Sequence, residues 1–245
     1  MLSKNQTKRI TLLKQKKYRL KEGLFVVEGI KGVGEFLNSD FELNVLITSN
    51  EQFYEKQTSK SGDKVVVVTQ NELQKVSTLV TAPEVLAVFK IPKKQALIRK
   101  GLTLVLDDLQ DPGNLGTIIR LCDWFGVHQV VCSTQTVDCY NPKVVQATMG
   151  SLARVSIIYV DLSKYLSQEH RPVLGTFLEG ESVYEIVKIK EAVLIMGNEA
   201  NGITETLVPF INHKITIPQL GNSTTTESLN VATATAICLS EFLRP

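Results

Sequence analysis

Three polar, glycine-containing turns hold the side chains of this sequence that are best suited to chemistry. They are DDLQDPGNLGTIIR (107–120), IMGNEANGI (195–203) and IPQLGNSTTTESLN (217–230). Each begins at the end of an apolar run that is typical of a buried strand. Ligands of open α/β sheets bind at the carboxyl ends of the strands. The three turns therefore predict one site built from segments that lie far apart in the sequence.

Asn114 and Arg120 are the candidates of the first turn. The segment DPGN (111–114) predicts a turn that enters a helix, in which Asn114 caps the first helical turn. Arg120 then lies nearly two helical turns farther along. The alternative interpretation is an ordinary capped helix with an exposed arginine.

The second and third turns supply a carboxylate and a helix start. Glu199 follows an apolar strand, and the local sequence leaves open whether its carboxylate belongs to a site or to a surface turn. Residues 221–226 are too polar for a core and run into Ser228-Leu229-Asn230. Free backbone N–H groups and hydroxyls there suit a carboxylate, a phosphate or adenosine. The alternative interpretation is a helix N-cap with a flexible segment before it.

Composition and missing motifs exclude several other classes of protein. Neither GxGxxG nor GxxxxGK[ST] occurs, so a nucleotide-dependent oxidoreductase and a P-loop enzyme lack their fingerprints. The four cysteines form no CxxC pair and only three histidines are present, which argues against a metal site and against a disulfide scaffold. The cysteines are expected to be buried in a reducing compartment. With no signal peptide and no apolar run of about 18 residues, we expect a cytoplasmic protein without membrane partners.

Charge is divided unevenly along the chain. Residues 1–100 carry 18 basic and 10 acidic residues, a net charge of +8, whereas residues 101–245 carry 9 and 15, a net charge of −6. The first 21 residues hold eight basic residues and no acidic one. This is the charge that a binder of phosphate backbones needs, although a solvated helix face and a linker would look the same.

The elements that position these residues form two α/β domains. Over the first, the pattern predicts strands at 24–29, 45–49, 64–69 and 85–90 and helices at 3–20, 30–38 and 71–78. Residues 91–101 hold a proline and no acidic residue, so they are the predicted linker. The second domain has predicted strands at 102–109, 128–133, 155–160, 173–178, 192–197 and 214–218, with helices at 115–126, 141–150 and 228–243. The apolar strands indicate a parallel sheet.

Together and in this order, the three turns resemble the signature motifs of the SpoU (TrmH-like) RNA 2′-O-ribose methyltransferases, in the SPOUT superfamily. The motif NxGxxxR matches Asn114, Gly116 and Arg120. The motif GNExxG matches Gly197, Asn198, Glu199 and Gly202. The motif IPxxG followed by SLNV matches Ile217, Pro218, Gly221 and residues 228–231. The resemblance covers about residues 101–243, and residues 12–29 are similar to a small substrate-binding domain found in many members.

The resemblance implies a fold and a site. Residues 101–245 would form a parallel-sheet SPOUT methyltransferase domain with a trefoil knot, preceded by a small α/β RNA substrate-binding domain over 1–95. The knot of the family binds S-adenosyl-L-methionine, and members are usually homodimers that need no metal. Carried over by motif, the reaction-site residues are Asn114, Arg120, Glu199, Ser228 and Asn230. The residues expected to line the cofactor pocket are Gly197, Ile217 and Leu229, together with Thr176 at the end of its predicted strand.

The implied reaction is methyl transfer to a ribose 2′-hydroxyl. Arginine keeps its proton in nearly all proteins, so Arg120 would stabilise the developing alkoxide or hold the adjacent phosphate. Glu199 and Asn114 would orient Arg120 or the ribose, and Ser228 and Asn230 would hold the loop and the nucleotide. Ribosomal RNA is the preferred substrate because the two-domain layout is similar to that of the ribosomal RNA members. A tRNA 2′-O-methyltransferase is one alternative, and a non-catalytic RNA-binding or ribosome-assembly factor is another.

Overall fold

A computed structural model of the 245-residue chain describes residues 2–53, 55, 64–93, 96–186, 191–221 and 228–245. The chain divides into two compact units. Unit 1 is Met1–Lys94 with Asp138–Ala153, and unit 2 is Gln95–Val137 with Arg154–Pro245. No sequence pattern indicates that residues 138–153 join unit 1.

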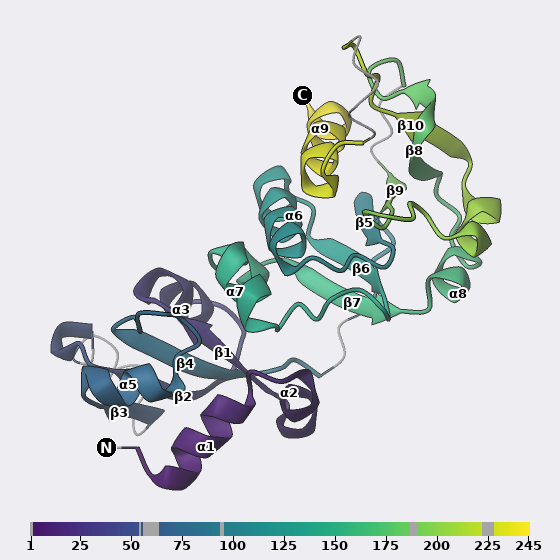
Figure 1. Cartoon of the computed structure of the whole chain (residues 1–245). Helices are drawn as coiled ribbons and strands as arrows, with labels where there is room; N and C mark the ends of the chain where they lie inside the picture. Colours follow the sequence, from purple (N-terminus) through teal and green to yellow (C-terminus); the bar gives the residue numbers. More distant parts are fainter. Residues whose placement is uncertain (1, 54, 56–63, 94–95, 187–190, 222–227) are drawn as a thin grey trace. The chain divides into compact units, whose positions relative to one another are not determined.

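Unit 1 is built on a four-stranded sheet with the strand order β1-β4-β2-β3 (Figure 1). The strands are β1 (Leu24–Glu28), β2 (Leu43–Thr48), β3 (Val65–Val67) and β4 (Val85–Lys90). β4 is antiparallel to β1 and β2, and β3 is parallel to β2. The helices are α1 (Lys4–Leu12), α2 (Lys16–Glu22), α3 (Ile30–Leu37), α5 (Gln70–Val76), α7 (Pro142–Thr148) and the short η2 (Ser151–Ala153). The alternating pattern predicted for this region is confirmed.

The basic N-terminal segment forms two helices and not the single helix predicted over 3–20. α1 and α2 are separated by a turn in which the guanidinium of Arg19 donates to the carbonyl oxygens of Leu13 (2.9 Å) and Lys14 (3.0 Å). Arg19 is buried and also pairs with Asp138 at 2.6 Å. Leu20, at the end of the predicted helix, lies in α2 and is exposed. The prediction was wrong here because periodicity could not show that a long-range ion pair holds the chain in this turn.

Unit 2 contains six parallel strands in the order β10-β8-β9-β5-β6-β7. They are β5 (Leu102–Leu106), β6 (Gln129–Ser133), β7 (Ser156–Val160), β8 (Val173–Ser182), β9 (Ala192–Met196) and β10 (His213–Thr216). The helices are α6 (Pro112–Phe125), α8 (Leu162–Leu166), η3 (Glu205–Phe210) and α9 (Val231–Leu243). α9 packs against α6 (Figure 1). The predicted parallel sheet is confirmed; the short helices α8 and η3 were not predicted.

The chain adds strands to the sheet in opposite directions on the two sides of the boundary between β5 and β9. The chain leaves β5 through α6 toward β6 on one side, and it leaves β9 through η3 toward β10 on the other. The neighbouring strands β5 and β9 pair in parallel, from Leu102 opposite Ala192 to Leu106 opposite Met196. In such sheets ligands bind outside the carboxyl ends of the strands at this switch point. The sheet topology therefore places a candidate site after Leu106 and Met196.

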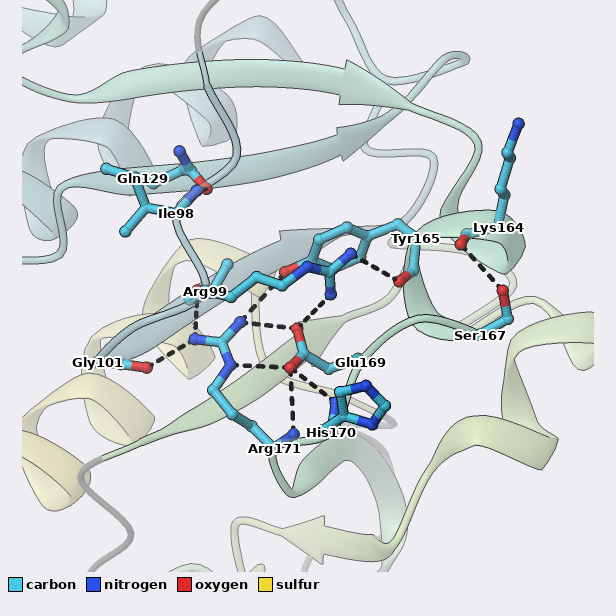
Figure 2. A network of polar contacts seen from close by, with 11 residues as sticks. Ile98, Arg99, Gly101, Gln129, Lys164, Tyr165, Ser167, Glu169, His170 and Arg171 are labelled. Atoms are coloured by element: carbon cyan, nitrogen blue, oxygen red, sulfur yellow. Dashed lines mark hydrogen bonds and ion pairs between the residues drawn. The ribbon is translucent and has the colours of Figure 1, made fainter.

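The opposite, amino-terminal edge of the sheet carries a buried charged cluster. Figure 2 shows Glu169 between Arg171 and Arg99, with carboxylate–guanidinium distances of 2.8 Å and 2.9 Å. Arg171 also donates to the carbonyl oxygen of Gly101, just before β5 (2.9 Å). Arg99 lies 4.7 Å from the centroid of the Tyr165 ring. Each charged group of the cluster has a partner. Because Arg99 and Gly101 belong to the predicted linker 91–101, we infer that the cluster holds the end of this linker on unit 2.

The four cysteines are free and buried, as the sequence predicted. Burial raises the pKa of the Cys238 thiol to about 12, so this group packs as a neutral side chain. Among the described residues, no helix has both the length and the apolar character needed to cross a bilayer.

Candidate active site

Asp111, and not Asn114, caps the helix that carries the first motif. The Asp111 carboxylate accepts from the backbone N–H of Asn114 at 2.7 Å, and Pro112 begins α6. Both are favoured at these positions. The capping role predicted for the Asn114 side chain was wrong because the preceding aspartate takes it. The amide of Asn114 is therefore available for contacts beyond its own helix.

Asn114 joins the three turns that the sequence singled out. Its Nδ2 donates to Oε1 of Glu199 at 3.1 Å, and its Oδ1 accepts from Nδ2 of Asn230 at 2.9 Å. An amide meets both needs because it carries a donor and an acceptor on one planar group. These three predicted site residues thus form one hydrogen-bonded chain, which we call the amide bridge.

Asn230 fixes the third turn at the start of α9. Its Oδ1 accepts from the backbone N–H groups of Ala232 (3.0 Å) and Thr233 (3.3 Å), so it is the N-cap of the helix. The predicted helix start at 228–230 is confirmed. Because the same amide also donates to Asn114, capping α9 orients Asn230 within the amide bridge.

Glu199 is carried on a tight loop after β9. Asn198 and Gly202 exchange two backbone hydrogen bonds, of 2.8 Å and 3.0 Å. Gly202 has a φ of +68°, which favours glycine. A Cβ on Gly197 would lie 2.3 Å from the backbone carbon of Gly202, so residue 197 must also be glycine for the loop to close. The two glycines of the motif therefore shape the loop that presents Glu199.

The remaining predicted reaction residues do not join the amide bridge. Arg120 lies on α6 with an exposed side chain and makes no hydrogen bond or ion pair with any described residue. Ser228 is also exposed, and its side chain has no hydrogen bond within the described part of the chain. Both side chains are thus available to a bound partner.

The four predicted cofactor residues lie on segments that leave or approach the same side of the sheet. Thr176 lies within β8, which continues to Ser182, and not at a strand end as predicted; its hydroxyl donates to the carbonyl oxygen of Ile195 (3.1 Å). Gly197 directly follows β9, Ile217 directly follows β10, and Leu229 precedes α9. The Ser/Thr-rich residues 222–226 of the third turn lie outside the described residues.

Sequence reasoning assigned no role to Asp107 and Asp108, although they begin the first turn. Asp107 is 3% exposed, and its carboxylate accepts from the backbone N–H of Thr204 at 2.7 Å. Burial raises the pKa of Asp107 above its usual value, and the hydrogen bonds from Thr204 oppose this shift. A pair of acids after a continuous apolar strand is the signal that could have found them.

A metal site is not apparent in the described part of the chain. No group of three or more His, Cys, Asp or Glu residues there lies close enough together to hold an ion. The predicted reaction-site residues bring amides, one guanidinium, one carboxylate and one hydroxyl to the site.

Comparison with known proteins places the chain in a family. Residues 101–240 match the model of the SpoU rRNA Methylase family, and residues 4–87 match that of the MRM3-like substrate binding domain. The chain is 32% identical over 230 residues to the 23S rRNA (guanosine(2553)-2′-O)-methyltransferase RlmP of Bacillus subtilis (strain 168), covering 92% of this chain and 90% of that protein.

Two solved structures are similar over the whole chain. A TrmH-family protein from Porphyromonas gingivalis has a TM-score of 0.91 and 41% identity, covering 100% of this chain and 99% of its own. An AdoMet-bound rRNA methyltransferase from Sinorhizobium meliloti has a TM-score of 0.87 and 29% identity, covering 100% and 97%. The family match spans the three turns that meet in the amide bridge, and the chain belongs to the SpoU rRNA methylase family.

Proposed function

We propose that this protein transfers a methyl group from S-adenosyl-L-methionine to a ribose 2′-hydroxyl of ribosomal RNA. The observation that carries the proposal is the amide bridge: Asn114, Glu199 and Asn230 meet at the switch point of the sheet. The relatives named as ribosomal RNA 2′-O-methyltransferases and the AdoMet-bound neighbour support the reaction class and the cofactor.

The residues around the carboxyl edge fit this cofactor. Leu178, Leu220 and Leu229 are 75%, 90% and 47% exposed, which is unusual for large apolar side chains and suits the faces of an adenosine group. Backbone groups of the tight loop after Gly197 and of Ile217 supply hydrogen-bond partners, and Thr176 of β8 donates to the carbonyl oxygen of Ile195 in β9, two residues before Gly197. The bound cofactor would supply a methyl group on a positively charged sulfur.

The protein's own residues must hold the ribose and manage the charge on its oxygen. Methylation of the 2′-hydroxyl would release its proton to solvent water and leave the cofactor as a neutral thioether, so charge on the ribose oxygen would have to be stabilised during the transfer. Arg120 keeps its own proton, so its guanidinium stabilises the negative charge that develops on this oxygen, or holds the adjacent phosphate. The amide bridge fixes Glu199 and Asn230 for orienting the nucleotide, and Ser228 supplies a hydroxyl beside it.

Unit 1 is the proposed RNA-binding part. Of the eight basic residues among the first 21, Arg9 pairs with Glu22, Arg19 is buried, and Lys14 donates to the carbonyl oxygen of Ser77. The exposed lysines without an ion pair to a described residue are Lys4, Lys8, Lys16, Lys17 and Lys21. When such ammonium groups bind phosphates, they release the counterions that surround the nucleic acid, and this release favours binding. The exposed lysines therefore support an RNA partner.

The proposal includes a homodimer, a trefoil knot in unit 2 and a cytoplasmic location. Trp124 on α6 is 85% exposed, and an exposed aromatic residue is typical of an interface core. Sedimentation of the wild type beside Trp124→Glu tests the dimer: the wild type should sediment as a dimer and the variant as a monomer.

The deciding experiment measures transfer of labelled methyl from S-adenosyl-L-methionine to ribosomal RNA that lacks the modification. Wild-type protein should label the RNA as an alkali-stable 2′-O-methyl nucleotide, and Arg120→Ala should lose the label while keeping its affinity for the cofactor. Label in tRNA instead would support the alternative substrate. A folded wild-type protein that labels neither RNA would contradict the proposal and favour an assembly factor.

A further inference from the structure

A buried carboxylate with no cation beside it lowers the stability of a fold. Unit 2 has such a carboxylate next to the candidate active site. Asp107 is 3% exposed and forms no ion pair with a described residue. It directly follows β5, where its backbone N–H donates to the carbonyl oxygen of Met196 at 3.0 Å. Burial of an unpaired charge destabilises a fold unless its hydrogen bonds compensate. The proposed reaction gives this carboxylate no role, so its burial at this position calls for another explanation.

The carboxylate of Asp107 holds the far end of the loop that carries Glu199. Its Oδ2 accepts from the backbone N–H of Thr204 at 2.7 Å. Thr204 lies two residues after Gly202, where the loop closes, and directly before η3. The hydrogen bond therefore fixes the point at which the loop returns to the sheet.

Asp108 holds the near end of the same loop. Its carbonyl oxygen accepts from Nδ2 of Asn198 at 2.7 Å. Asp108 has a φ of +54°, a conformation that non-glycine residues rarely adopt and that persists only when neighbours enforce it. Ser133 provides that enforcement, because its hydroxyl bonds to the carboxylate of Asp108 and accepts from its backbone N–H (3.0 Å). In this conformation the carbonyl oxygen of Asp108 points to Asn198 in the loop and accepts its hydrogen bond.

The loop is closed on itself between these two attachment points. The side-chain oxygen of Asn198 accepts from the backbone N–H groups of Ala200 (2.9 Å) and Asn201 (3.1 Å). The backbone position of Glu199 therefore depends on where Asp107 and Asp108 hold the ends of the loop.

We propose that Asp107 and Asp108 are positioning residues, which hold the 197–204 loop so that its backbone can bind S-adenosyl-L-methionine and its Glu199 can meet Asn114. The cofactor part of this inference rests on the proposed function, whereas the attachment of the loop does not. Neither aspartate needs to touch the reacting atoms, because each acts through the backbone or side chain of the loop.

Two measurements test the inference in the full-length protein. The first is the dissociation constant for S-adenosyl-L-methionine by calorimetry, which needs no RNA and no turnover. Asp107→Ala should raise this constant at least tenfold, and Asp107→Asn should stay within threefold of wild type because the amide oxygen still accepts from Thr204. Asn198→Asp, at a half-buried position, loses the Nδ2 donor to Asp108 but keeps the side-chain oxygen that accepts from Ala200 and Asn201. It should also raise the dissociation constant at least tenfold.

The second measurement is amide hydrogen exchange without cofactor. Asp107→Ala should speed exchange at Thr204 and Gly202 at least tenfold and leave the strand β5 unchanged. Glu169→Gln is the control, since it alters a buried carboxylate at the opposite edge of the sheet; it should change neither exchange at the loop nor the dissociation constant.

The outcomes separate this inference from the proposed function. If wild-type protein binds no S-adenosyl-L-methionine but Asp107→Ala still loosens the loop, the positioning role stands and the proposed function fails. If folded Asp107→Ala and Asn198→Asp bind the cofactor and exchange as wild type does, the positioning role is wrong. Equal weakening by Glu169→Gln would likewise overturn it, because general loss of stability would then explain the effect.

Discussion

The side-chain amide of Asn230 donates to that of Asn114 across 2.9 Å, although 116 residues of sequence separate them. Asn230 is the N-cap of α9 and Asn114 lies in the first turn of α6, two helices that pack together. The contact therefore couples helix capping to the geometry of the proposed reaction site. Removing Asn114 would disconnect Glu199 from Asn230 as well.

Asn114→Asp should lower the turnover number for methyl transfer by about 100-fold, which is the usual effect of losing one aligned donor in an active site. The change removes the Nδ2 donor and places a second carboxylate against Glu199, 3.1 Å away in the wild type. Single-turnover transfer from labelled S-adenosyl-L-methionine measures the effect. Asn71→Asp, an exposed residue of unit 1, is the matched control and should keep wild-type activity.

Glu199→Gln distinguishes charge from hydrogen bonding at the same place. The glutamine oxygen can still accept from Asn114, so a purely orienting role predicts activity within about threefold of wild type. A loss as large as that of Asn114→Asp would show that the negative charge of Glu199 itself is required.

The exposed lysines of α2 should set the salt dependence of RNA binding. Changing Lys16, Lys17 and Lys21 together to Gln should lower the slope of log K against log salt by about 2, because each lost phosphate contact removes about 0.7 for single-stranded RNA. Affinity at 0.1 M salt should then fall roughly 100-fold. Filter binding to unmodified ribosomal RNA over a series of salt concentrations measures both quantities.

The control for this experiment changes three exposed lysines of unit 1 outside α1 and α2: Lys31, Lys75 and Lys143. It makes the same change in net charge and should leave the slope near its wild-type value. An equal fall in slope for the two triple variants would assign RNA binding to net charge and not to the surface of α2.

Arg19→Met should destabilise unit 1 by about 3–5 kcal/mol, the usual effect of leaving one partner of a buried ion pair. Arg19 donates to Asp138 and to two backbone carbonyl groups, so the change leaves three acceptors without this donor. Urea unfolding measures the loss. If the double variant with Asp138→Asn is as unstable as the two single changes added together, the ion pair contributes nothing of its own.

The cluster around Glu169 predicts how stability depends on pH. Burial alone would raise the pKa of Glu169, but hydrogen bonds and charge from Arg171 lower it to about 2, below the usual value of 4.5. A lowered pKa in the folded state adds stability above pH 4.5 that is lost as the pH falls toward 2. By this linkage Glu169 contributes about 3 kcal/mol at neutral pH.

Unfolding of wild type and Glu169→Gln at several pH values tests this expectation. The wild type should be more stable at pH 7, and the difference should shrink below pH 4.5 and nearly vanish near pH 2. Glu179→Gln, at an exposed position, is the control for the loss of one negative charge. A pH-independent difference for Glu169→Gln would contradict the assigned ion pair.

The sequence by itself determined the classes of element and named the candidate residues of the site. Strand and helix periodicity is local, so β5, β9 and α6 were predictable, and Gly126 ends α6 in the left-handed conformation expected of it (φ +73°). The resemblance of the three motifs, in order, to those of the family marks Asn114, Glu199 and Asn230 as candidates from the sequence alone.

Only the tertiary structure decided which of these groups meet and what holds them. The break after α1 depends on Arg19 reaching Asp138. The start of α6 at Pro112 depends on Asp111, whose carboxylate accepts from the backbone N–H of Asn114. The roles of Asp107 and Asp108 depend on β5 lying beside β9, which follows from the strand order. Such contacts join residues tens of positions apart, and their energies depend on burial and geometry that no local pattern encodes.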